Sequence, residues 1–461
     1  MLHLSERMSD ASLDSMNYLN EVVERYPDAI SFAPGRPSPE LFGVERSLDL
    51  LRKHAPAVLG RPNMRSAEAL DEIAQYGRTN GIVHRHIARQ LLQDEGLELD
   101  PNQLVITNGC QEAMLLLLLT LFAPARDVLL ATEPVYLGIT AAARLLGIEV
   151  VPIRLRPDGP DLEQVANATE VLRQHGKVPR ALYTIPDFDN PSGYTTSLAK
   201  RHQLCALARR HDLLLLEDMP YRMLRYERAP LPLLKAIDPE QVVLLGSYSK
   251  ILFPGLRLGF LTGDVEVSLG GRVLPLSEIA SKAKSLTSVN TSPLMQATLA
   301  CVLIENGHSL SSHAARISAH YRKKRDALLL AMERHFPRRS SEIPGVFWNR
   351  PEGGFFMTVH MPFEFTMPLV EECAAKAGAI VAPMSLFAFA TAHGHAVRLS
   401  FSAVEPKDIE EGVARLASFV REREAKSTTQ AANPYEAASM QPRSDHHIGQ
   451  GCLQRAGLPV A

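Results

Sequence analysis

The sequence predicts an α/β protein with a large domain, built on a mostly parallel sheet flanked by helices, and a smaller α+β domain. Between about residues 100 and 270, short apolar segments alternate with longer segments of helical periodicity. The apolar segments are almost continuously hydrophobic, as expected for parallel strands that helices cover on both faces. From 345 to 424 strand and helix patterns mix, and a chain of 461 residues has room for a second domain.

Each element follows from its local pattern. Residues 10–28 predict a helix, and the three prolines of 33–39 then exclude a regular helix. One long helix is expected over 292–336, with 321–325 as a solvated basic face, and strands are expected at 355–359 and 397–401. In the large domain the predicted strands are 104–107, 127–132, 149–153, 181–185, 213–216 and 242–245, and the predicted helices are 110–123, 137–146, 161–174, 198–211 and 230–237.

These elements predict four regions. Residues 1–60 form an N-terminal arm and part of the small domain, 61–310 the large domain, and 311–425 the C-terminal small domain. Beyond 426, Ser, Thr, Gln, Asn, Ala and Pro dominate and hydrophobic periodicity ends. Such a segment buries too little apolar area to offset its ordering entropy, so 426–461 is predicted to be a disordered tail.

Composition is ordinary for a globular enzyme. The formal net charge of -2 gives no reason to expect a nucleic acid or an anionic membrane as partner. The five cysteines show no metal-ligand spacing and are expected to be thiols in a reducing cytoplasm. The first 25 residues lack the long apolar block of a secretory signal, and the longest apolar run, 113–125, is too short to span a bilayer.

The most informative segment is 246–260, where Lys250 follows Ser247 and Ser249 at the end of an apolar strand. A lysine that loses hydration there has a lowered pKa, and a neutral amine forms an imine with an aldehyde. The two serines and Arg257 supply donors for a phosphate. An aldehyde and a phosphate in one ligand indicate pyridoxal 5'-phosphate. The competing interpretation is a surface lysine followed by a routine arginine.

Two further segments suit the same ligand. Gly109, Cys110 and Gln111 follow strand 104–107 and open a helix, and helix N-termini bind phosphate. Tyr136 follows strand 127–132, where an aromatic ring stacks on a planar heterocycle. Alone, the first segment is equally a plain strand-to-helix turn, and the second a tyrosine packed in the core.

Polar residues also follow the next strands. A partly desolvated carboxylate at Asp218 needs a partner, which a protonated pyridine nitrogen provides, and this pairing keeps the ring electron-accepting. Tyr221 and Asn190 are placed to reach the ring oxygen. The alternatives are a helix N-cap aspartate and an ordinary Asn-Pro turn. Arg398, alone in an apolar strand, either grips a carboxylate with two hydrogen bonds or points to water from an edge strand.

With these residues in view, the chain resembles, over roughly 15–422, the fold-type I pyridoxal-phosphate enzymes of the aspartate aminotransferase superfamily (aminotransferase class I and II). The nearest branch includes 2-aminoadipate and kynurenine aminotransferases and the aminotransferase-like domains of MocR regulators. The matching segments are 30–42, 75–77, 190–193, 246–260, 351–356 and 398–401.

The resemblance implies residue roles. Lys250 would form the imine and later shuttle the proton, and Arg398 would clamp the substrate α-carboxylate, with Asn190 and Gly35 beside it. Tyr76 would reach the phosphate of the neighbouring subunit's cofactor, which implies a homodimer with shared sites. The remaining cofactor residues would be Asp218 (ring nitrogen), Asn190 and Tyr221 (ring oxygen), Tyr136 (stacking), and Gly109, Cys110, Gln111, Ser247, Ser249 and Arg257 (phosphate).

The departures cluster at the expected substrate mouth. The usual Gly-Gly-Leu is here Pro34-Gly35-Arg36, so Arg36 either grips a second acid group or faces solvent. Arg78 stands where proline is usual, and 383–387 lacks the usual Pro-Gly.

Three functions follow. The leading prediction is amino transfer between an L-amino acid and a 2-oxo acid. The alternative is a specialised enzyme of secondary metabolism that performs substitution, elimination, oxidation or cyclisation on an amino acid. A non-catalytic sensor like the MocR domain is disfavoured, because the resemblance begins near residue 15 and leaves no room for a DNA-binding segment.

Overall fold

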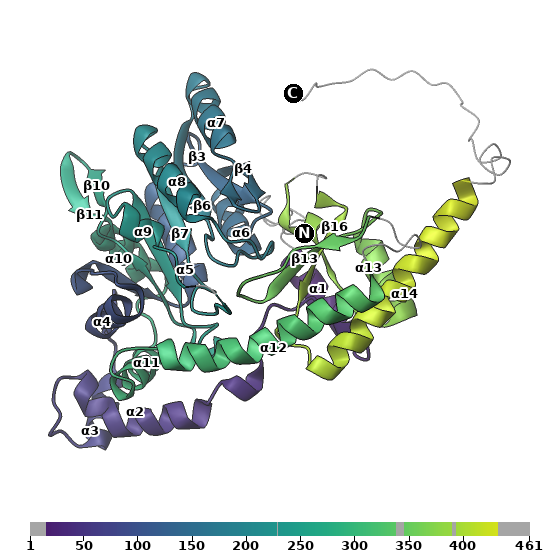
Figure 1. Ribbon diagram of the computed structural model, residues 1–461. Coiled ribbons are helices and arrows are strands. Elements are labelled where there is room, and N and C mark those ends of the chain that lie inside the picture. The colour runs from purple at the N-terminus through teal and green to yellow at the C-terminus, as the bar shows by residue number, and fades with distance from the viewer. Residues whose placement is uncertain (1–14, 228, 338–344, 390–392, 432–461) are drawn as a thin grey trace, which may run out of the picture.

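The computed structural model describes residues 15–431 except 228, 338–344 and 390–392 (Figure 1). A large α/β domain and a smaller α+β domain lie side by side, and helix α12 (Ser311–His335) runs beneath the boundary between them. This confirms the predicted fold class. No helix within these ranges combines the length and apolar character needed to cross a bilayer.

The large domain is organised around one mixed sheet. Strands β8, β7, β6, β3 and β4 are parallel, while β9 pairs antiparallel with both β8 and β2, and β5 pairs antiparallel with β4. In sheet order the strands are β2 (Leu104–Thr107), β9 (Gly259–Thr262), β8 (Val242–Ser247), β7 (Leu214–Asp218), β6 (Val178–Thr184), β3 (Asp127–Glu133), β4 (Glu149–Arg156) and β5 (Gly159–Pro160).

Helices cover both faces of this sheet. Because side chains alternate along a strand, Leu129 packs on one face and Leu130 on the other. The Leu129 face packs against α5 (Cys110–Leu121), α6 (Leu137–Leu146) and α10 (Leu276–Thr287); the Leu130 face packs against α7 (Leu162–Gln174), α8 (Leu198–Arg210) and α9 (Leu234–Ile237). The sheet is therefore buried on both sides, as its uniformly apolar strands predict.

The small domain packs a short antiparallel sheet against long helices. Its strands run in the order β12 (Phe347–Trp348), β13 (Phe356–His360), β16 (Ala396–Ser400) and β15 (Ala382–Pro383). The entry strand β1 (Ile30–Ser31) pairs in parallel with β14 (Ala379–Ile380), which ties the N-terminal segment to this domain. The flanking helices are α1 (Ser15–Arg25), α12, α13 (Met367–Ala377) and α14 (Pro406–Ala431).

The remaining elements lie around the large domain. Helices α2 (Val44–Val58) and α11 (Pro293–Glu305) pack together at its base (Figure 1). Helices α3 (Ser66–Ile73) and α4 (His84–Glu95) and the ribbon of β10 (Glu266–Leu269) with β11 (Arg272–Pro275) complete it. Single 3-10 turns lie at Pro39–Leu41, Pro101–Gln103, Pro254–Leu256 and Met384–Phe387.

Three expectations need correction. The predicted helix 292–336 is two helices, α11 and α12, because Gly307 and His308 adopt positive φ between them. The predicted helix 230–237 shrinks to α9. Residues 426–431, expected to belong to the tail, are part of α14, which continues to Ala431; residues 432–461 lie outside the described ranges.

The basic run 321–325 is solvated only in part: Arg322 and Lys323 are exposed, but the other three residues are not. Helical spacing places Tyr321, Lys324 and Arg325 on the inner side of α12, where each is at most 1% exposed. Lys324 Nζ donates to Ser38 Oγ at 2.9 Å, and Arg325 donates to the Pro351 carbonyl at 2.9 Å. The charges are buried because each finds hydrogen-bond partners there.

Candidate active site

One cavity of about 310 Å³ lies at the carboxyl ends of the parallel strands, where the small domain meets the sheet. Segments that are far apart in sequence line it, including α1, the entry loop after β1 and the loops after β6, β7 and β8. It contains twelve of the residues singled out in the sequence: Gly35, Cys110, Gln111, Tyr136, Asn190, Asp218, Tyr221, Ser247, Ser249, Lys250, Arg257 and Arg398.

Lys250 follows β8 and projects its amine into this cavity. Its Nζ donates to the Gly35 carbonyl at 2.9 Å. Burial, together with the positive charges of Arg398 and Arg257, lowers the pKa of Lys250 to about 8. The buried Lys235 and Lys284 differ, because each bonds a carboxylate, Asp264 and Glu112 respectively. Lys250 is thus an amine kept partly neutral near pH 7, as a nucleophile requires.

Asp218 ends β7 and is only 2% exposed. Burial raises the pKa of its carboxyl to about 6, although hydrogen bonds from Tyr183 and Cys110 oppose this. The Tyr183 hydroxyl donates to Oδ2 at 2.7 Å, and the Cys110 thiol donates to Oδ1 at 3.2 Å. The N-cap alternative is wrong, because no helix begins at Asp218; in the described part of the chain the next helix is α9 (Leu234–Ile237).

The N-terminus of α5 forms one end of the cavity. Gly109 has φ +77, a conformation that favours glycine, and a Cβ there would lie 2.6 Å from Arg257 Nη2, so the guanidinium would have to shift. The Asn108 N–H donates to Glu112 at 2.6 Å, and Lys284 holds Glu112 at 2.7 Å, which braces the turn. The first turn of α5, Ser247, Ser249 and Arg257 thus line the same cavity, and helix N–H groups, hydroxyls and a guanidinium are donors that suit an anion.

The residues expected around the ring form a connected group. Tyr136 donates to Gln111 Oε1 at 3.1 Å, and Asn190 Nδ2 lies 3.4 Å from the Tyr221 hydroxyl. Asn190 and Tyr221 are buried, and burial raises the pKa of Tyr221 well above its usual range. Asn190 also contacts Arg398, so this pair links the ring region to the substrate end.

Arg398 lies on β16 and faces inward, which rules out a solvated edge-strand arginine. It is 5% exposed, and burial lowers its pKa to about 10. Its Nη1 donates to Asn190 Oδ1 at 2.9 Å and its Nη2 to the Ala33 carbonyl at 2.5 Å. Its buried Nε has no hydrogen-bond partner, so the guanidinium has capacity left for a carboxylate. Phe356 and Phe387 sandwich it, with ring centroids 4.5 and 4.6 Å from Cζ.

Two predicted residues do not reach the cavity. Arg36 is exposed and is not among the lining residues, which matches the solvent-facing alternative for its side chain. Tyr76 is 86% exposed. Gly109 is not itself a lining residue, but it packs directly against Arg257, which is one.

Sequence reasoning missed several functional residues. Tyr183 lies in the apolar strand β6 and bonds Asp218 through its hydroxyl. The one sequence feature that could have indicated this role is a hydroxyl group within a buried strand. Leu19 and Asn20 of α1, together with Leu137 and Phe387, line the cavity mouth and carry no motif.

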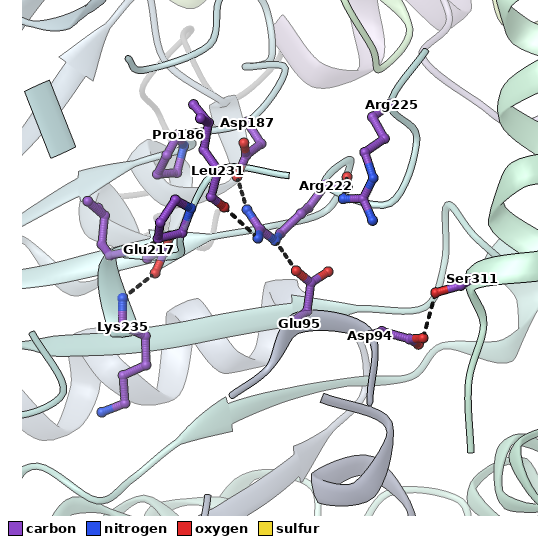
Figure 2. A network of polar contacts seen from close by, with 12 residues as sticks. Asp94, Glu95, Pro186, Asp187, Glu217, Arg222, Arg225, Leu231, Lys235 and Ser311 are labelled. Carbon is purple, nitrogen blue, oxygen red and sulfur yellow. Dashed lines mark hydrogen bonds and ion pairs between the residues drawn. The ribbon is translucent and has the colours of Figure 1, made fainter. Parts of the chain in front are cut away.

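A buried ion-pair network fixes the loops that carry Asn190 and Tyr221 (Figure 2). Arg222 bonds Glu95 at 2.6 Å, Asp187 at 2.8 Å and the Leu231 carbonyl at 2.7 Å. Arg201 bonds the same Asp187 at 2.6 Å. Burial raises the pKa of Asp187, but the two guanidinium groups outweigh it and hold the pKa below its usual value. Buried ion pairs therefore anchor the loops that carry Tyr221 and Asn190.

The donor set fits pyridoxal phosphate. A buried carboxylate, a partly neutral amine and an anion-binding helix end occur in one cavity and match the pyridine nitrogen, the aldehyde and the phosphate of one ligand.

Comparisons with known proteins agree. The aminotransferase class I and II family model matches residues 48–416. The (S)-3,5-dihydroxyphenylglycine transaminase of Amycolatopsis orientalis is 38% identical over 417 residues, covering 90% of this chain and 93% of that protein. The aromatic-amino-acid aminotransferase 1 of Thermococcus litoralis is 30% identical, covering 91% and 94%.

A solved kynurenine aminotransferase of Pyrococcus horikoshii, in complex with PMP, superposes with a TM-score of 0.78 at 29% identity, covering 91% of this chain and 97% of that one. The chain therefore belongs to the aminotransferase class I and II family, and it is a pyridoxal-phosphate-dependent enzyme that moves an amino group between an amino acid and a 2-oxo acid.

Proposed function

We propose that the amino donor is an L-amino acid with an uncharged aromatic side chain. The observation that carries this is the cavity mouth, where Leu19, Leu137 and Phe387 supply apolar surface. Among the described lining residues the lysines and arginines are Lys250, Arg257 and Arg398, and each of these has a role at the other end. An acidic side chain would therefore be desolvated without a partner, which is costly. The names of the two relatives, which specify dihydroxyphenylglycine and aromatic amino acids, support the same class.

The residues divide the work as follows. Arg398 binds the substrate carboxylate through its unpartnered Nε and through Nη2, which in this structure donates to the Ala33 carbonyl, while Asn190 accepts from Nη1. Bound pyridoxal phosphate supplies an electron-accepting ring that stabilises negative charge at the substrate Cα. Asp218 would hold the ring nitrogen, Asn190 and Tyr221 the ring oxygen, and Tyr136 one ring face. Gly109, Cys110, Gln111, Ser247, Ser249 and Arg257 would hold the phosphate.

Lys250 moves the proton. Its amine, with a pKa lowered to about 8, would hold the aldehyde carbon of pyridoxal phosphate in the resting enzyme, and the freed amine would accept the proton that leaves the substrate Cα. Arg398 fixes the substrate so that the Cα–H bond faces Lys250. Such positioning contributes up to about 7–11 kcal/mol toward the barrier.

The working unit would be a cytoplasmic homodimer with shared active sites. Tyr76, Leu286 and Val289 expose 86%, 83% and 54% of their area, which favours a protein partner over solvent. Tyr76 would then reach the phosphate of the cofactor bound to the neighbouring subunit. The free thiols of Cys110, Cys205, Cys301 and Cys373 favour a reducing compartment. Light scattering should give twice the chain mass, and Tyr76→Ala should weaken cofactor retention without changing that mass.

A spectral screen tests the donor. Holoenzyme mixed with phenylglycines, phenylalanine, tyrosine or kynurenine should convert rapidly to the amino form of the cofactor and release the matching 2-oxo acid. Glutamate and 2-aminoadipate should react more slowly as donors. Faster conversion by the acidic donors would contradict the proposed side-chain class, and spectral change without a 2-oxo acid product would point to the substitution or elimination alternative.

A further inference from the structure

The carboxylate of Asp218 is held by two side-chain donors from different elements. The Tyr183 hydroxyl, on neighbouring strand β6, donates to Oδ2 at 2.7 Å. The Cys110 thiol, at the first position of α5, donates to Oδ1 at 3.2 Å. Tyr183 and Asp218 are buried, at 1% and 2% exposed, whereas Cys110 is only partly buried and lines the cavity. Each oxygen of Asp218 therefore accepts a hydrogen bond from one side chain, and lone-pair capacity remains for a further partner.

Hydrogen bonds, rather than a neighbouring positive charge, stabilise the ionised form of Asp218. The groups whose own ionisation responds to Asp218 are Cys110, Tyr136, Tyr183, Tyr221 and Asp189. These come from α5, β6 and the loops after β3, β6 and β7, and each is neutral or acidic. The influences that favour the carboxylate are hydrogen bonds, chiefly from the Tyr183 hydroxyl and the Cys110 thiol. A buried carboxylate in this position is ionised only to the extent that its donors allow.

We propose that Cys110 and Tyr183 are a pair of positioning residues that set the charge of Asp218 and, through it, keep the proton on the cofactor ring nitrogen. This rests on the proposed role of Asp218 toward that nitrogen. When either donor is lost, the carboxyl becomes a weaker acid and takes the proton back from the ring. The ring then accepts electrons less well. The thiol of Cys110 would serve Asp218, and its backbone N–H would serve the phosphate.

The two donors should differ in strength. A short O–H···O⁻ bond is among the strong hydrogen bonds of proteins, whereas a thiol is a weak donor. Tyr183→Phe should therefore shift the titration of Asp218 upward by about one to two pH units. Cys110→Ala should shift it upward by less than one unit. Cys110→Ser, which offers a stronger donor of similar size, should shift it downward.

The titration is measurable on the full chain with the cofactor removed. Because its folded-state pKa is raised, Asp218 destabilises the fold as pH rises through about 6. The free energy of unfolding by urea, followed from pH 4.5 to 8, contains this inflection. Glu217 and Asp189 titrate nearby, at about 7 each, so each variant is compared with the same variant carrying Asp218→Asn, and the difference isolates Asp218.

Two controls separate this effect from general loosening. Cys205→Ser alters another buried thiol, and Tyr321→Phe another buried phenol, both away from Asp218. Both should leave the Asp218 inflection in place. The second readout is the affinity of each variant for added pyridoxal phosphate at pH 7.5. This affinity should fall at least several-fold in Tyr183→Phe, and it should be lower in Cys110→Ala than in Cys110→Ser.

The outcomes decide between the parts of the proposal. An Asp218 inflection that stays at the same pH in all three variants overturns the pairing. An inflection that moves as expected, with unchanged affinity for pyridoxal phosphate, overturns the link to the ring and with it the proposed role of Asp218. The expected shifts with parallel changes in affinity support both.

Discussion

The pKa of Lys250 gives the sharpest prediction about how the site works. A fall from 10.5 to about 8 increases the neutral fraction of the amine near pH 7 by about 10^2.5, or roughly 300-fold. The attachment of pyridoxal phosphate to the cofactor-free protein requires that neutral amine. The rate should therefore rise about tenfold per pH unit up to about 8 and then level off.

The perturbation that tests the cause is Arg398→Leu. Burial lowers the pKa of Lys250 most, and the charge of Arg398 comes next. Removal of that charge should move the midpoint of the rate profile upward but leave it below 10.5. Arg36→Leu is the matched control, because its side chain is exposed and outside the cavity, and its profile should be that of the wild type.

The assay is stopped-flow absorbance near roughly 420 nm, where the attached, protonated cofactor absorbs. A wild-type rate that keeps rising through pH 10 would refute the argument, since it would mean that Lys250 retains an ordinary pKa. An unchanged midpoint in Arg398→Leu would refute the electrostatic part alone.

Three further predictions follow. Arg222→Met, which leaves Glu95 and Asp187 without a shared buried cation, should lower the free energy of unfolding by about 3–5 kcal/mol in urea titrations. Arg52→Met, at an ion pair with Asp49 that is exposed on both sides, should cost at most about 1 kcal/mol, and equal effects would contradict the role of burial. Gly109→Ala should reduce phosphate-dependent cofactor affinity at least tenfold by equilibrium dialysis, because its Cβ would displace Arg257, and an unchanged affinity would remove Gly109 from the phosphate end. Arg398→Lys should raise KM for the amino donor far more than it lowers cofactor affinity, and the reverse ratio would contradict a carboxylate role.

The fold and the cofactor half of the site were predictable because local sequence determines them. Strand β2 and helix α6 occur at the predicted residues, since continuous apolar runs and turn residues define their limits. Residues that follow parallel strands must meet at one sheet edge, so Asp218, Asn190 and Lys250 converge as expected.

Other features depend on tertiary contacts that no local pattern encodes. Lys324 reads as a surface charge until Ser38 and Ser402, from distant segments, supply its partners. From the sequence alone Tyr183 is predicted to be a core aromatic residue, and only the folded structure brings its hydroxyl to Asp218. Leu19 reaches the cavity mouth only because α1 packs against α13 of the small domain, a contact between distant segments.

The most direct test of the central claim is to reduce the holoenzyme with borohydride, digest it and locate the pyridoxyl group by mass spectrometry. The account predicts a single labelled peptide, with the group on Lys250. A label on Lys235, Lys284 or another lysine, or no label on protein that still transfers amino groups, would contradict it.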